Sequence, residues 1–239
     1  MERIEIKNCR ILLLLLVWAC GTFGALVFAQ QSAQSPAYRQ AAGIHIGSTG
    51  IGAQYFHPLG TQFGLRAGLS FMPFSTSIKG TYSGRKTPSD IKAHANHASL
   101  LFGYAPFSGR GGFFNSFGFE LGGAYFFKLD GDFETRLSDP YKHGDILVDP
   151  ERVGLIYADV KWKKTVSPYL GMGWSNIHLT DKLSGHLNLG CYYLSKPRVT
   201  LEATGLLKEN VINQEQVQHN IRNYRYLPRL ELGVSYSLK

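Results

Sequence analysis

PRLELGVSYSLK, residues 228–239, is the stretch that decides the fold class. Apolar side chains occupy every second position, and charged or small side chains lie between them. The apolar set is Leu230, Leu232, Val234, Tyr236 and Leu238. Successive side chains of a strand point to opposite faces of a sheet, so this period of two predicts a β-strand with one apolar face.

Seven earlier segments alternate in the same way, so we predict an all-β fold with eight antiparallel strands. The earlier segments fall within 43–56, 63–71, 100–107, 117–128, 156–163, 169–174 and 186–193. Six or ten strands are the alternatives, because Arg198–Ala203 has strand character too. The chain is basic, with a formal net charge of +8, and it contains 27 glycines. These features favour an up-and-down transmembrane β-barrel, apolar outside and polar inside. The rival architecture is a water-soluble lipocalin-like barrel, in which the apolar faces would point inward and the charged faces outward.

The N-terminal residues have the features of a secretory signal. Basic residues precede an apolar core at Ile11–Val17, and Val27-Phe28-Ala29 fits a cleavage site. A retained anchor, or a lipoprotein modified at Cys20, is the alternative. No later run approaches the ~20 apolar residues of a spanning helix. The expected organisation is a cleaved signal peptide over 1–29, a disordered lead over 30–42 and one outer-membrane barrel domain over 43–239.

Two segments interrupt the regular alternation. The apolar phase of the first strand changes between Ile46 and Ile51, which predicts a bulge or kink at Gly47 and Gly50. The polar stretch Gly205–Asn223 predicts one short helix before the last strand, either a lid or a connector. With both termini in the periplasm, three of the four external connections look tight, although long loops are usually external.

Charged side chains fall at the inward positions of several predicted strands. The interior of an eight-stranded barrel is only wide enough to be filled by side chains. Buried charges there must pair to offset the cost of desolvation. The predicted lumen charge network consists of Arg66, Glu120, Asp159, Lys161, Lys163, Arg229 and Glu231. The alternative interpretation is a narrow path for small solutes lined by the same charges.

Large aromatic side chains suit the girdles that membrane barrels carry at both interfaces. The predicted girdle residues are Trp162, Trp174, Tyr193 and Tyr236. Catalytic chemistry has little support, because His97 beside Ser99 is the only Ser/His spacing worth naming. His94 and His97 fall on opposite faces of a strand, so we predict no metal site, no cofactor and no catalytic residue.

Four stretches resemble a family of small bacterial outer-membrane β-barrel proteins, mostly uncharacterised, with the build of the OmpA transmembrane domain and OmpW. They are Leu100–Phe107, Ser167-Pro168-Tyr169-Leu170-Gly171-Met172-Gly173-Trp174, Leu187–Gly190 with Lys196–Val199, and Pro228–Tyr236. The resemblance covers most of residues 43–239. It implies the barrel fold and an envelope location, and it carries no known active site.

These observations predict a barrel in the outer membrane of a Gram-negative bacterium. The expected role is non-catalytic, either structural or in surface interaction through polar loops. A narrow channel or carrier for small solutes, in the manner of a porin, is the first alternative. A lipid-modifying enzyme is the second. The expected partners are outer-membrane lipid, lipopolysaccharide and the barrel assembly machinery, together with an unknown surface partner and no nucleic acid.

Overall fold

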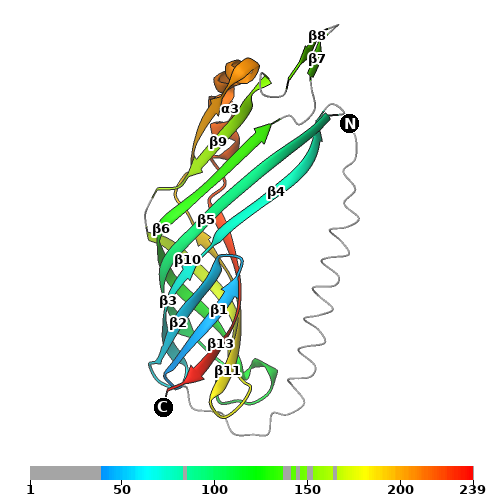
Figure 1. Ribbon diagram of the computed structural model, residues 1–239. Helices are drawn as coiled ribbons and strands as arrows, with labels where there is room; N and C mark the ends of the chain where they lie inside the picture. The colour runs from blue at the N-terminus through cyan, green and yellow to red at the C-terminus, as the bar shows by residue number, and fades with distance from the viewer. Residues whose placement is uncertain are drawn as a thin grey trace.

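The computed structural model describes residues 39–82, 85–136, 141–143, 146–149, 153–163 and 166–238. Eight antiparallel strands close a barrel (Figure 1), which confirms the predicted fold class. In ring order they are β1 (Ala41–Gly47), β2 (Gly50–Pro58), β3 (Phe63–Phe71), β5 (Arg85–Tyr104), β6 (Phe117–Arg136), β10 (Val166–His178), β11 (Leu183–Tyr193) and β13 (Tyr226–Ser237). The predicted signal peptide lies outside the described residues.

The first predicted strand is in fact a hairpin. β1 and β2 pair from Ala41 opposite Phe56 to Gly47 opposite Gly50, which leaves a two-residue turn at Ser48 and Thr49. Gly50 has a φ of 106°, a backbone conformation that glycine adopts without steric cost. The change of apolar phase therefore marks a chain reversal, and the predicted bulge within one strand was wrong.

Strands β5 and β6 are each 20 residues long and continue above the barrel. There they carry three further strands, which form with them a sheet that we call the extension: β4 (Pro73–Tyr82) beside β5, β9 (Leu155–Lys161) beside β6, and β12 (Arg198–Ala203) beside β9. The predicted fifth barrel strand is β9, so it lies outside the ring. The count of eight is right because this extra strand offsets the missed hairpin.

The long connections lie at one end of the barrel. Ala41 pairs with Ser237 at the other, lower end, where both ends of the described chain lie (Figure 1). The lower connections join β2 to β3, β5 to β6 and β10 to β11, and the second contains a short 3₁₀ helix, η1 (Phe113–Ser116). The upper connections contain the extension and the small β7 (Tyr141–His143) and β8 (Ile146–Val148) pair. Splitting the first hairpin and removing β9 from the ring together remove the apparent conflict over loop placement.

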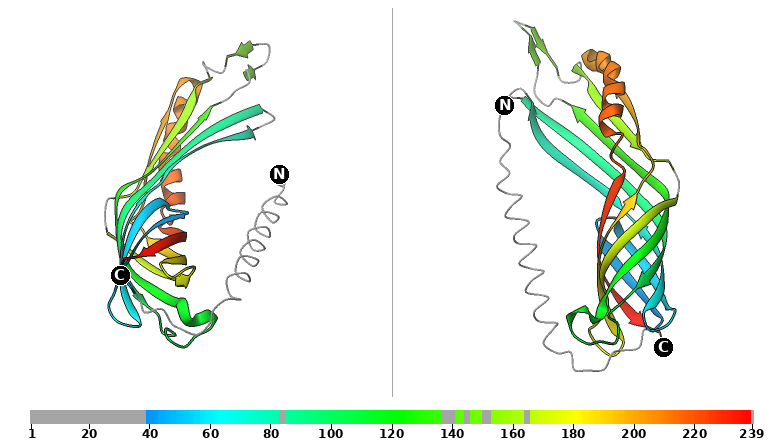
Figure 2. Two further views of the ribbon diagram at one scale, coloured as in Figure 1. Left: turned by 60° about the horizontal axis from the view of Figure 1, so that its bottom comes forward. Right: turned by 180° about the vertical axis from the view of Figure 1, so that it is seen from behind.

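The predicted helix before the last strand consists of a 3₁₀ segment, η2 (Gly205–Asn213), followed by α3 (Gln214–Ile221). It lies along the free edge of β12 (Figure 2). Gln218 accepts a hydrogen bond from Val199 N at 2.9 Å and donates one to Pro197 O at 2.9 Å. Gln214 accepts one from Leu201 N at 3.0 Å. These amides satisfy backbone groups that an edge strand would otherwise leave unpaired. No helix among the described residues is long and apolar enough to cross a membrane.

Candidate functional site in the barrel lumen

Alternation along β13 brings two opposite charges into the lumen. Arg229 and Glu231 are each 1% exposed, whereas their neighbours Leu230 and Leu232 are exposed on the outer surface. The two inward side chains form an ion pair with each other. Because successive residues of a strand face opposite ways, the sequence that makes the outer face apolar also fixes this pair inside.

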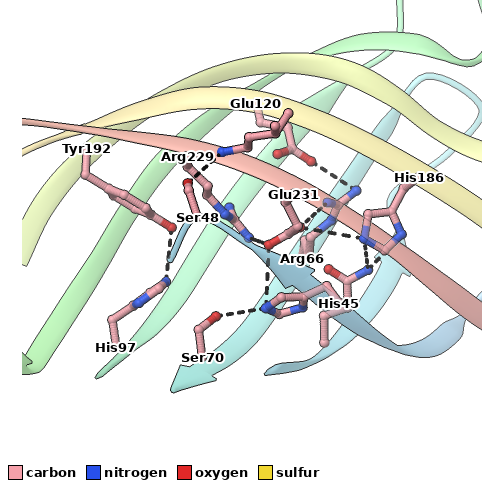
Figure 3. A network of polar contacts seen from close by, with 12 residues as sticks. His45, Ser48, Arg66, Ser70, His97, Glu120, His186, Tyr192, Arg229 and Glu231 are labelled. Carbon is pink, nitrogen blue, oxygen red and sulfur yellow. Dashed lines mark hydrogen bonds and ion pairs between the residues drawn. The ribbon is translucent and has the colours of Figure 1, made fainter. Parts of the chain in front are cut away.

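Glu231 is the centre of the lumen network (Figure 3). Besides Arg229, its carboxylate lies 3.7 Å from Arg66 Nη1. His45 Nε2 lies 3.5 Å from the carboxylate and His186 Nε2 lies 3.6 Å from it. Four strands, β1, β3, β11 and β13, therefore meet at one buried carboxylate. Such convergence holds opposite walls of the barrel together.

Arg66 extends the network toward the lower end. It pairs with Glu120 at 3.0 Å and donates a hydrogen bond to Ser175 Oγ at 3.0 Å. Both charged side chains are nearly buried, at 6% exposure each. Arg66 thus bridges two carboxylates from different strands, Glu120 of β6 and Glu231 of β13. This arrangement compensates two acidic charges that the lumen would otherwise bury alone.

Aromatic side chains fill the lumen above the charges. The Arg229 guanidinium lies 5.3 Å from the centre of the Tyr169 ring and 5.9 Å from that of Tyr192. Tyr169 lies between Gly171 and Gly190, where an added methyl group would collide with its ring. The buried apolar cluster at this level consists of Ala95, Leu101, Ala124, Phe126, Tyr169, Tyr192 and Leu194. We call it the upper plug.

Two small cavities adjoin the network at the lower end. Each has a volume of about 30 Å³, and Phe56, Arg66 and Ser175 line both. A buried water needs roughly 10–15 Å³ by the same kind of measure, so each cavity accommodates one or two water molecules. With the upper plug above them, the described residues leave no room here for a solute of metabolite size.

The structure divides the predicted lumen charges into two groups. Arg66, Glu120, Arg229 and Glu231 meet inside the barrel, as described above. Asp159, Lys161 and Lys163 lie instead on β9 and just beyond it, above the ring. Lys161 pairs there with Asp159 and its side chain is 66% exposed. They lie outside the lumen because β9 belongs to the extension.

The predicted girdle aromatics also fall into two groups, three near the ends of the ring and one that faces inward. Trp174 packs against Phe117, with ring centres 5.1 Å apart, and Tyr236 is 47% exposed on the outer surface; both lie toward the lower end. Tyr193 is 40% exposed toward the upper end. Trp162 packs against the upper plug, and its Nε1 donates to Tyr224 O at 3.2 Å. Trp162 therefore faces inward, since it continues the inner face of β9.

Sequence reasoning missed the two histidines that contact Glu231. His186 alternates with the apolar Leu187 and Leu189, and this period of two is the signal that places it on the inward face. His45 lies in the hairpin whose phase was misread. The Ser99 and His97 pair also faces the lumen, where His97 contacts Ala95 O at 3.2 Å and Tyr192 OH at 3.3 Å. Neither side chain lies on the outer surface of the ring.

Crystal structures of two Acinetobacter baumannii proteins are among those that share this fold. The crystal structure of Acinetobacter baumannii CarO2 matches with a TM-score of 0.63 at 19% sequence identity, covering 84% of this chain and 99% of that chain. Acinetobacter baumannii CarO matches with a TM-score of 0.60 at 21% identity, covering 84% and 98%. No protein-family model matches the chain, and no curated protein matches it in sequence. The likeness establishes the fold, and the finer resemblance to the OmpA and OmpW builds stays a prediction.

Proposed function

We propose that the chain is an outer-membrane barrel protein with a non-catalytic structural or surface-interaction role. The first support is the outer surface of the ring, which is apolar on every side. Its exposed side chains include Ile44, Ile51, Leu69, Leu100, Phe119, Leu121, Leu170, Leu189, Leu232 and Val234, between 42% and 69% exposed. Water-soluble monomers rarely expose apolar patches beyond a few hundred Å². A hydrocarbon surround accounts for this surface.

The observation that carries the proposal is a reversal of faces along β5 and β6. Within the ring, the outward side chains of these strands are apolar; Leu100 is 55% exposed and Leu121 is 62% exposed. A β-bulge lies between Asn96 and His97 of β5, opposite Lys128 and Phe126 of β6. Below this level the apolar face of the sheet is its outer face.

Above the bulge the same strands turn their polar side chains outward. Lys92 is paired with Asp132, and Asp90 with Glu134, on the outer face of the extension. Ile91 pairs with Phe133 on the opposite, inner face. In water, an antiparallel sheet commonly keeps its apolar face on the core and its polar face in solvent along each strand. The reversal therefore supports a change of solvent from lipid to water at the level of the bulge.

The spacing of aromatic residues fits this boundary. Tyr226 and Tyr236 lie ten residues apart on the outer face of β13, and they are 71% and 47% exposed. At about 3.3 Å per residue they are about 33 Å apart along the strand. A strand tilt of about 40° reduces this to ~25 Å across the membrane, the height of the apolar band of outer-membrane barrels.

The contents of the lumen favour a structural role over the alternatives. A channel or carrier would need the upper plug and the Arg229–Glu231 pair to move, and these side chains are almost completely buried. A lipid-modifying enzyme would need Ser99 and His97 at the rim. The extension offers a polar outer face for contacts beyond the membrane. Outer-membrane lipid, lipopolysaccharide and, during assembly, the barrel assembly machinery are the proposed partners.

Heat-modifiability on a gel, with protein from the outer-membrane fraction, tests this proposal. A folded band in cold detergent that shifts on boiling is the expected result. A water-soluble protein without a shift would contradict the membrane location. Conductance in planar bilayers then separates the roles, because a filled lumen predicts no channel steps. Regular steps that disappear when Arg66 is replaced would favour the channel instead.

A further inference from the structure

A basic groove lies on the extension just above the ring. Its volume is about 900 Å³, and it lies between the end of β9, the start of β12 and α3. Among the described residues, its lining includes four basic side chains and no acidic one. The basic set is Lys161, Lys163, Lys196 and Arg198. We call this the rim groove.

Two of the four basic side chains lie on the outer face of the extension. Lys161 and Arg198 are paired directly across β9 and β12, so they share one face of the sheet. Both are exposed, whereas Val199 is buried and Trp162 packs against the upper plug on the inner side. Lys161 and Arg198 therefore lie on the face that, lower down, continues as the outer wall of the ring.

The position of the groove matches the level of lipid headgroups. Tyr193, the last outward aromatic side chain of β11, packs against Tyr226, with ring centres 5.4 Å apart. The exposed Lys196 follows three residues later along the chain. Arg225 lies over the Tyr193 ring at 4.3 Å and adds a further cation at the same level. The outward surface thus changes from apolar to aromatic and then to basic.

The charge of the groove restricts the class of ligand. Lys161 pairs with Asp159, which lies just outside the lining, and Lys163, Lys196 and Arg198 bring three further basic side chains to the groove. A phosphate monoester carries roughly −1.5 to −2 at pH 7. One or two such groups would balance the lining, and Ser195 and Thr200 supply hydroxyl groups beside the cations. Phosphates on a lipid of the outer leaflet combine this charge with this position.

We propose that the rim groove binds the phosphate groups of lipid A in the outer leaflet. This inference rests on the proposed function, because the groove lies at headgroup level only if the barrel spans the outer membrane. Lipid A contributes both parts of the ligand. Its acyl chains lie against the apolar wall below, and its phosphates lie among the lysines and the arginine above.

Trp162 lines the groove and supplies a local probe. The test uses protein in which Trp18 and Trp174 are replaced by phenylalanine, so that Trp162 is the remaining tryptophan. Bisphosphorylated lipid A in detergent micelles is titrated into this protein while its fluorescence is recorded. A saturable change is expected, and dephosphorylated lipid A or inorganic phosphate alone is expected to produce none.

The matched variants carry equal changes of charge. K163Q/K196Q/R198Q removes three cations from the groove, and K79Q/K182Q/K208Q removes three exposed cations elsewhere. The groove variant is expected to bind lipid A at least tenfold more weakly, about 1.4 kcal/mol. The control variant is expected to bind like the parent protein. Equal affinities for the two variants, or equal binding of dephosphorylated lipid A, would overturn the inference.

Two measurements keep the test decisive. The heat shift of each variant reports whether its barrel is folded, and a parent protein without the shift would refute the proposed function rather than this inference alone. If the groove variant fails to fold, the salt dependence of the parent protein decides. Raising the ionic strength from about 0.1 M to about 1 M shortens the Debye length from ~10 Å to ~3 Å. An affinity that does not fall would contradict binding through phosphate.

Discussion

Replacing Glu231 by glutamine tests the lumen network most sharply. The side chain keeps its shape, but the charge that faces Arg229 and Arg66 is lost. At an effective dielectric constant near 20, charges about 4 Å apart attract by roughly 4 kcal/mol. Arg66 retains Glu120, whereas Arg229 loses its only carboxylate partner among the described residues. Removing one member of a buried ion pair costs about 3–5 kcal/mol, so we expect E231Q to lower the free energy of unfolding by an amount in this range.

The assay is equilibrium unfolding in urea, with the barrel refolded into lipid vesicles and followed by circular dichroism. E202Q, at an exposed position of β12, is the matched control and should change the free energy of unfolding by less than about 0.5 kcal/mol. In the double variant R229M/E231Q, the loss should be smaller than the sum of the single losses by at least ~1 kcal/mol. If E231Q lowers the free energy of unfolding no more than E202Q does, the buried network is refuted and a hydrated lumen is favoured.

Three further changes have defined outcomes. G190A places a methyl group against the Tyr169 ring, so the barrel should lose about 1–3 kcal/mol of stability in the same urea assay. Q218A leaves the Val199 amide without its acceptor, so hydrogen exchange at that amide should accelerate. Tyr157 lies in the extension, and its hydrogen bond to a neighbouring aspartate raises the pKa of the phenol to about 12. The stabilisation from this hydrogen bond should be complete below pH 10, the ordinary pKa of tyrosine, and should disappear as the pH rises to about 12. NMR follows the titration of the phenol.

Each of these changes has its own control. G103A places its methyl group at ordinary contact distances of 3.7 Å and more, and a loss equal to that of G190A would contradict the ring contact. Q216A removes an exposed amide from the same helix and should leave the exchange of Val199 unchanged. Asp132 accepts the Tyr157 hydrogen bond at 2.7 Å, and in D132N the tyrosine should titrate closer to 10. If D132N leaves the pKa of Tyr157 unchanged, the hydrogen bond to Asp132 is not what raises it.

The sequence predicts the ring strands well where their outward positions are apolar. In β10, β11 and β13 most outward positions are apolar or aromatic, and the inward positions below the upper plug are small or polar. This constraint comes from the solvent on each side, so it is visible in the sequence itself. Arg229 and Glu231 could be placed in the lumen for that reason, before any contact between them was known.

The errors arose where alternation leaves the partner of a strand undefined. A period of two shows that a strand has two different faces, but it does not show which face is turned toward lipid. Lys161 and Trp162 alternate like residues of a barrel strand, although β9 pairs with β6 above the ring. In the first hairpin, Gly47-Ser48-Thr49-Gly50 lacks the Asn-Gly or Asp-Gly pair that usually signals a two-residue turn. His45 was missed for the same reason.

The reversal of faces along β5 and β6 is the central claim, and spin-label accessibility measures it most directly. Labels are placed one at a time at outward positions of a C191A protein in lipid vesicles. Leu100 and Leu121 lie below the bulge, and Lys92 and Glu134 lie above it. We predict that the two lower labels collide mainly with oxygen dissolved in the lipid, and the two upper labels with a water-soluble nickel complex. Equal access of the nickel complex to all four positions would contradict the account.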